Sequence, residues 1–171
     1  MKSFFLTVLL AAASIFGMMV PATAQNSKKS GQAKEELRNL IDAYASLGDE
    51  KKIAEVAGLF TPDGTYKVYM NGTLVGNISG SDKIEKEFIG HASLVKTYFT
   101  LNGQHTVKID GNTASGVSFT QTKMIRDTDD KDILTDYSVR YDDRYVNLKG
   151  KWLIKERTGH FIIVEARPLN N

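Results

Sequence analysis

The chain has 171 residues, with 22 Lys or Arg against 20 Asp or Glu, so its formal net charge is +2. This length predicts a single domain with one core. The small charge excludes the strongly basic surface of a dedicated nucleic-acid-binding protein, so no nucleic-acid partner is expected. Because the sequence has no cysteine, disulfides, zinc–thiolate sites, iron–sulfur clusters and thiol nucleophiles are excluded.

Residues 1–24 have the pattern of a secretory signal peptide. Lys2 supplies the positive start, an apolar run continues to Val20, and the segment ends in the small-x-small pattern Ala-Thr-Ala. A membrane anchor is the alternative, but no basic stop-transfer cluster follows. We expect cleavage after Ala24, export to the bacterial periplasm or the extracellular space, and no membrane association once the signal is removed.

The rest of the chain divides into a polar lead-in (25–33), one domain (34–165) and a short tail (166–171). Residues 25–33 predict a flexible segment. Within the domain, apolar residues at helical spacing predict three helices. These run from Lys34 to Leu47, from Asp49 to Phe60, and from Ser81 to Tyr98 with a possible break at Gly90.

Strands make up the remainder of the domain. A hairpin is predicted between 66–70 and 73–78, because Asn71-Gly72 suits a type I′ turn. Alternating apolar and polar residues predict four further strands, at 104–110, 113–126, 133–148 and 151–164.

This order predicts an α+β, cone-shaped barrel in which three N-terminal helices pack on a strongly curved antiparallel sheet. Strands as long as 133–148 must twist and curl, so helices laid inside the curl enclose a cavity. The exposed strand faces favour burial against a second copy, so a homodimer is expected.

Several local strings carry a resemblance to a known family. They are Tyr44-x4-Asp49, Leu59 to Tyr66, Gly103-Gln104-His105 ahead of Ile109-Asp110-Gly111, and Gly150 to Ile154. Together with the element order, they make residues 34–165 similar to the SnoaL-like group of the nuclear transport factor 2-like superfamily. The resemblance implies a cone-shaped fold that serves either small-molecule isomerases, cyclases and dehydratases, or non-enzymatic binding and dimerising domains.

The catalytic pattern most similar to this sequence is that of the scytalone dehydratase-like branch, which uses Tyr, Asp and two strand-borne His residues. By this resemblance Asp49 corresponds to the helix-end Asp, Tyr66 to the strand Tyr and His105 to the first His. The second His is expected near Met124, but the strand 113–126 contains none. The acid–base set of that branch is therefore only partly present.

Five residues are candidates for catalysis. His105 alternates with Val107 and Ile109 and is expected to point inward, where a neutral imidazole can act as a general acid and base. Asp49 or Asp63 is expected to orient it or to act as the base, with helix capping and turn formation as the structural alternatives. A buried Tyr hydroxyl can donate to an oxyanion, and two residues qualify. These are Tyr44 and Tyr66, for which core packing is the alternative.

Four residues are candidates for ligand binding. Tyr137 and Tyr141 share one face of a strand, and alternation places Trp152 and His160 on one face of the last strand. The three histidines lie in separate elements without metal-ligand spacing, and no phosphate loop, nucleophile elbow or dinucleotide fingerprint appears. We therefore expect no metal and no cofactor.

Two hypotheses of different classes follow from the sequence. In the first, an exported, cofactor-independent dehydratase or isomerase uses His105 as general acid and base on a small apolar or aromatic molecule. In the second, the same cavity holds a small molecule without catalysis, or is closed by side chains in a dimerisation module. The missing second His favours the second hypothesis, and the inward His beside a carboxylate and phenols favours the first.

Overall fold

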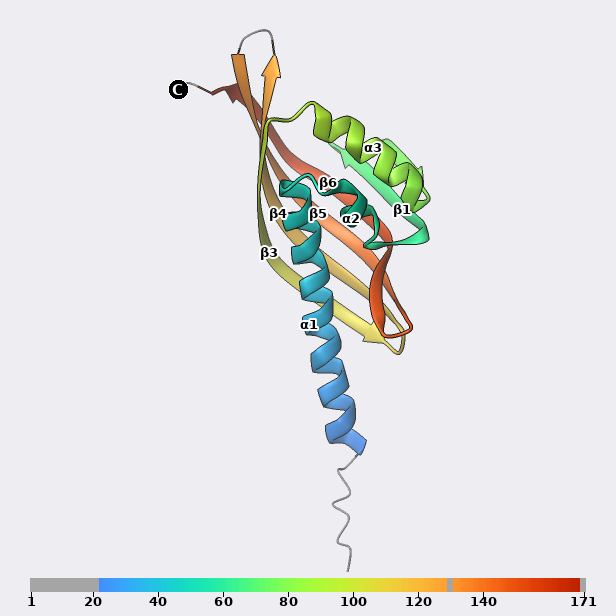
Figure 1. The fold of residues 1–171 in the computed structure, drawn as a ribbon. Helices are drawn as coiled ribbons and strands as arrows, with labels where there is room; N and C mark the ends of the chain where they lie inside the picture. The colour runs from blue at the N-terminus through green and yellow to red at the C-terminus, as the bar shows by residue number, and fades with distance from the viewer. Residues whose placement is uncertain (1–21, 129–130, 170–171) are drawn as a thin grey trace, which may run out of the picture.

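The computed structural model describes residues 22–128 and 131–169. The described residues form three helices and one six-stranded sheet. In chain order the elements are α1 (Ala22–Asp49), α2 (Ile53–Ala57), β1 (Phe60–Met70), β2 (Thr73–Ser79), α3 (Ser81–Ser93), β3 (Thr97–Asp110), β4 (Thr113–Thr128), β5 (Lys131–Leu148) and β6 (Lys151–Pro168). The three helices lie on one face of the curved sheet (Figure 1), which confirms the predicted α+β cone.

The strands follow the order β2-β1-β6-β5-β4-β3. Neighbouring strands are antiparallel except β1 and β6, which are parallel. The sheet is therefore mixed, and it differs from the predicted antiparallel sheet at this one pair. The long separation of β1 and β6 in sequence explains the difference, because no hairpin turn signals such a pairing.

Two helices have limits that differ from the predicted ones. Helix α1 begins at Ala22 and so includes 25–33, the segment expected to be a flexible lead-in. Helix α3 ends at Ser93, and Tyr98 belongs to β3 rather than to the third helix as predicted. Of the predicted signal peptide, residues 1–21 lie outside the described residues. No helix within 22–128 and 131–169 is long and apolar enough to cross a membrane.

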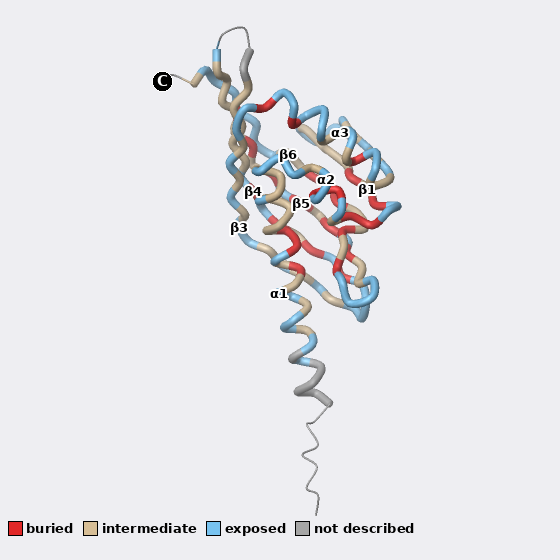
Figure 2. Tube along the Cα trace, viewed as in Figure 1, coloured by how far each residue is buried: buried red, intermediate tan, exposed pale blue. Residues whose placement is uncertain are grey.

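The core lies between α1 and the concave face of the sheet. Helix α1 buries Leu37, Leu40 and Ile41, which recur at helical spacing and so form one apolar stripe. Their neighbours across the interface include Tyr145 and Ile154 from the middle of the sheet. In Figure 2 the buried segments accordingly concentrate where the helices meet the strands.

Two bulges change which residues of β6 face the core. Lys155 is an extra residue, because Ile154 pairs with Tyr145 and Glu156 with Arg144. Burial alternates through Trp152 and Ile154, then shifts by one position to Arg157 and Gly159. Ile162 is extra in the same way, since Phe161 pairs with Val139 and Ile163 with Ser138. The first bulge turns Arg157 inward and His160 outward.

Two tight turns have the geometry of two-residue hairpins. Asn71 and Gly72 both have positive φ angles, of 50° and 78°. Lys149 and Gly150 likewise have φ angles of 53° and 87°. Two consecutive positive φ values are what a type I′ turn requires, so the predicted Asn-Gly hairpin is confirmed.

Candidate functional site

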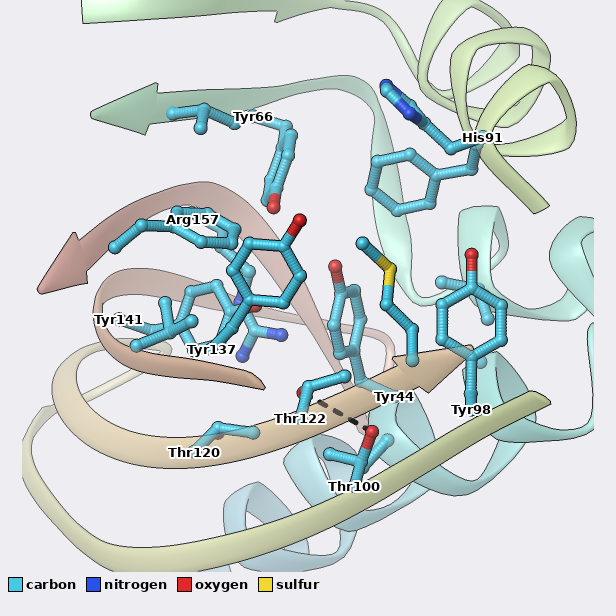
Figure 3. Close-up of a pocket in the computed structure, with 18 of the residues that line it drawn as sticks. Tyr44, Tyr66, His91, Tyr98, Thr100, Thr120, Thr122, Tyr137, Tyr141 and Arg157 are labelled. Carbon is cyan, nitrogen blue, oxygen red and sulfur yellow. Dashed lines mark hydrogen bonds between the residues drawn. The ribbon is translucent and has the colours of Figure 1, made fainter. Parts of the chain in front are cut away.

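A cavity of about 480 Å³ lies between the helices and the concave face of the sheet. Its wall is formed mainly by aromatic, aliphatic and threonine side chains, many of which are shown in Figure 3. Five of the nine sequence candidates line it: Tyr44, Asp49, Tyr66, Tyr137 and Tyr141. The cavity therefore brings together residues from α1, β1 and β5.

The cavity has a buried end and an open end. At the buried end Ile41, Ser118 and Arg157 are at most 3% exposed. At the other end the lining residues Val75 of β2 and His91 of α3 are exposed. A small molecule would therefore enter past β2 and the end of α3.

A buried ion pair closes the deep end. Nε and Nη2 of Arg157 donate to the two carboxylate oxygens of Asp143, each at 2.9 Å. The Tyr145 hydroxyl donates to the same carboxylate at 2.7 Å. Burial opposes the charge of Arg157, but the Asp143 carboxylate more than offsets it and holds the pKa of Arg157 well above its ordinary value. The pair is therefore charged and internally neutralised.

The guanidinium of Arg157 also lies between two aromatic rings. Its Cζ is 4.1 Å from the ring centroid of Tyr44 and 4.5 Å from that of Tyr141. Both distances are within the range of cation–π attraction. These contacts fix the two phenols as walls of the cavity and cover the cation from the ligand side.

Neutral phenol groups surround the deep half of the cavity. Burial raises the pKa of Tyr44, and it raises those of Tyr66 and Tyr141 further. The Arg157 guanidinium opposes the shift at all three residues. The phenols therefore stay protonated at neutral pH, and Figure 3 shows the hydroxyls of Tyr44 and Tyr66 directed into the cavity. They can donate hydrogen bonds to a ligand oxygen.

Asp49 lines the cavity, but its carboxylate already has partners. The backbone N–H of Thr100 donates to one oxygen at 2.8 Å and the Thr100 hydroxyl to the other at 2.6 Å. The Thr100 and Thr122 hydroxyls are 3.3 Å apart. Asp49 therefore joins the end of α1 to β3, and it does not cap α2, whose first residue follows Lys52 without a side-chain cap.

His105 lies outside the cavity lining, although it points inward as predicted. Its Nε2 is 3.3 Å from the Tyr145 hydroxyl. Gly116 of β4 leaves space for this contact, since an added Cβ there would lie 2.9 Å from Tyr145 and 3.1 Å from His105. His105 is thus the outer member of the Asp143–Tyr145 cluster rather than a partner of Asp49.

The other candidates occupy three different environments. Asp63 is exposed, accepts a hydrogen bond from Thr61 and forms an ion pair with Lys155. Trp152 is buried in the core. His160 lies on the outer face, where it stacks on Tyr69 and pairs with Asp142 at 3.1 Å. None of these three side chains lines the cavity, and the bulge at Lys155 explains the outward position of His160.

Several lining residues were not candidates from the sequence. Arg157, Thr100, Tyr98 and Phe161 all line the cavity. Asp143, which neutralises Arg157, follows Tyr137 and Tyr141 in strict alternation on β5, so this alternation could have identified it. Among residues 22–128 and 131–169, no three His, Asp or Glu side chains are grouped so that they could hold a metal ion.

The matching family agrees with this fold and cavity. The SnoaL-like domain family matches residues 30–158, so the chain belongs to this family. An uncharacterised protein of Mycobacterium tuberculosis is 26% identical over 123 residues, which cover 71% of this chain and 80% of that protein.

Solved structures show the same fold at low sequence identity. A proposed scytalone dehydratase from Novosphingobium aromaticivorans has a TM-score of 0.73 and 16% identity, covering 84% of this chain and 93% of that one. The hexachlorocyclohexane dehydrochlorinase LinA-type3 from Novosphingobium barchaimii has a TM-score of 0.69 and 12% identity, covering 85% and 95%. An NTF2-like protein from N. aromaticivorans has a TM-score of 0.63 and 19% identity, covering 85% and 92%. The fold is therefore NTF2-like.

We predict that His105 makes stability depend on pH. Burial lowers its pKa from 6.5, Arg38 and Arg157 add to the effect, and Asp143 and Asp42 oppose it. The pKa of His105 is lower in the folded protein than in the unfolded chain. Its contribution to the free energy of unfolding is therefore complete above about pH 6.5, and it decreases as the pH falls from that value toward the folded pKa. Urea denaturation followed by the fluorescence of Trp152 should show a smaller loss between about pH 7.5 and 5.5 in His105→Gln. An unchanged loss in the variant would contradict the assignment.

We predict that Arg157→Met lowers the free energy of unfolding by about 3–5 kcal/mol, because it leaves the Asp143 carboxylate buried without a counter-charge. The double variant Arg157→Met/Asp143→Leu should recover part of the loss. Arg144→Met is the control, since Arg144 is exposed and 3.8 Å from Glu156, and it should change stability by less than about 1 kcal/mol. A double variant no more stable than the single one would show that the charge is not the cause.

Proposed function

We propose that this protein is an exported SnoaL-like protein that binds a small, mainly apolar or aromatic molecule in its cavity. The observation that carries the proposal is the cavity of about 480 Å³, which has the size and composition of a small-molecule site. Aromatic and aliphatic side chains supply its area. A few placed hydroxyl groups supply its specificity. Export rests on the signal pattern of residues 1–24.

The deep end of the cavity favours an uncharged group with an acceptor oxygen. Arg157 is neutralised by Asp143 and covered by the rings of Tyr44 and Tyr141. An anion placed there would have to compete with Asp143 for the guanidinium, at a high desolvation cost. A carbonyl or hydroxyl oxygen, by contrast, can accept from a neutral phenol such as Tyr66.

Similarity to enzymes supports a second candidate, a cofactor-independent dehydratase or related lyase. Its specific observation is the position of Asp49, whose carboxylate lines the cavity. In this reaction Asp49 would take a carbon-bound proton beside a carbonyl group, and Tyr66 would donate a hydrogen bond to the enolate oxygen that forms. As the carbonyl re-forms, the C–O bond of the neighbouring hydroxyl group would break, and that group would leave as water with the proton held by Asp49. His105 would have no direct role, because its ring contacts Tyr145 outside the cavity. Asp49 is hydrogen-bonded to Thr100 and not to His105, the imidazole that it was expected to orient.

Native mass spectrometry of the protein purified from its host's exported fraction tests the binding proposal. We expect a chain that begins at Gln25 and carries a defined guest, which denaturation releases. Val68→Trp should lose the guest, because Val68 lines the cavity and the larger ring fills it. Tyr66→Phe should weaken binding by about tenfold through loss of one hydrogen bond.

Thr106→Trp is the matched control, because Thr106 is exposed on β3 and does not line the cavity. It should keep the guest. Retention of the guest by Val68→Trp would place the guest elsewhere and overturn the proposal. If the guest is instead consumed on incubation and Asp49→Asn binds it without consuming it, the second candidate function replaces the first.

We propose that the protein is a homodimer and that the outer face of the sheet is its interface. Phe99, Leu101 and Phe119 lie on this face of β3 and β4 and are 43–54% exposed. Ile163, on the same face of β6, is 53% exposed. A patch of large apolar side chains of this kind marks an interaction surface, and a two-fold axis would cover it with the same patch of a second copy.

We predict a dimer in native mass spectrometry and light scattering, and a monomer for Leu101→Glu, because the carboxylate would be buried in the interface. Leu74→Glu, an exposed change on edge strand β2, is the control and should stay dimeric. A monomeric wild-type protein would contradict the prediction.

A further inference from the structure

Arg126 lies on β4, just beyond the residues of this strand that line the cavity. On β4, Ser118, Thr120, Thr122 and Met124 alternate and all line the cavity. Arg126 is the next residue on this face, one step beyond Met124 toward the end of the strand. Its side chain is only half-buried. The cation is therefore adjacent to the cavity wall and partly open to solvent.

Two phenols adjoin Arg126. Tyr98 pairs with Met124 across the β3–β4 ladder, and Tyr137 lies two residues from Thr135, the β5 partner of Met124. Burial raises the pKa of both phenols, and the Arg126 guanidinium opposes this rise in each case. The influence of Arg126 on the pKa of each phenol agrees with a guanidinium close to both rings.

The other charged groups around the mouth have partners within the chain. Glu87 and His91 of α3 pair with each other at 3.3 Å, and Asp49 accepts from Thr100. Among the carboxylate side chains that the structure describes, none forms an ion pair with Arg126. Arg126 is thus the cation that remains available to a ligand at this end of the described structure.

We propose that the ligand is an amphipathic acid whose apolar or aromatic body fills the cavity and whose carboxylate binds Arg126 beside Tyr98 and Tyr137. This inference rests on the proposed binding function and specifies the ligand class. The orientation follows from the two ends of the cavity. The inner cation, Arg157, is neutralised by Asp143, whereas Arg126 has a planar set of N–H donors that suits a carboxylate.

Competition between two isosteric compounds tests this inference. N-phenyl-1-naphthylamine, an uncharged dye that fluoresces in apolar sites, reports occupancy of the cavity. 2-Naphthoate and 2-naphthamide, which have the same shape but differ in charge and in the N–H donors of the amide, are then titrated against it. We expect 2-naphthoate to bind about tenfold more tightly, as for a charge-assisted hydrogen bond at a partly exposed site.

Three variants assign the preference to one residue. Arg126→Met should lower the affinity for 2-naphthoate by about tenfold and change that for 2-naphthamide by less than about twofold. Arg126→Lys should retain part of the preference. Arg144→Met, an exposed arginine removed from the mouth, should retain all of it. Urea denaturation followed by the fluorescence of Trp152 confirms that each variant is folded.

The outcomes separate the two proposals. If the dye does not bind the wild-type protein, or if it binds Val68→Trp equally well, the cavity is not a binding site and the proposed function fails. If the dye binds and both naphthalene compounds displace it equally, or if Arg126→Met keeps the preference for 2-naphthoate, only the role of Arg126 is overturned.

Discussion

The buried pair of Arg157 and Asp143 is the interaction on which the rest of the site depends. Both side chains are at most 1% exposed, and such a pair is tolerable only when its hydrogen bonds are nearly complete. Here Asp143 accepts from Arg157 twice and from Tyr145 once. The pair joins β5 to β6 at the point where α1 packs against them, and it anchors the rings of Tyr44 and Tyr141 that form the cavity wall.

The same pair decides the chemistry of the cavity. A free guanidinium at the deep end would select anions, but one that is neutralised by Asp143 and covered by two rings leaves mainly phenol hydroxyls facing the space. The wall is then apolar with neutral donors. Arg126, half-buried on β4 beyond Met124, is the charge that we propose a ligand uses. In this proposal the deep end offers neutral hydrogen-bond donors and the other end offers a cation. A compact neutral molecule would interact with the deep end alone.

The sequence predicts the fold well and the site only in part, and the bulges explain much of the difference. Periodicity on α1, β1 and β5 correctly brings Tyr44, Tyr66, Tyr137 and Tyr141 to the cavity, because these elements keep their regular period. On β6 the extra residue Lys155 reverses the alternation. His160, expected inside, is therefore outside, and Arg157 is inside. Strict alternation cannot reveal a bulge, and no turn signal reveals that β1 lies parallel to β6.

The arrangement of acid–base groups is the reason that we propose binding ahead of catalysis. Each group that could transfer protons is directed at another part of the chain: Asp49 at Thr100, His105 at Tyr145, and Asp143 at Arg157. A general base needs a free lone pair on the substrate side, and hydrogen bonds to a carboxylate stabilise its charged form and weaken it as a base. The phenols, in contrast, face the cavity as neutral donors. The cavity of this SnoaL-like domain is thus lined by neutral donors, while the charged groups hold its walls together.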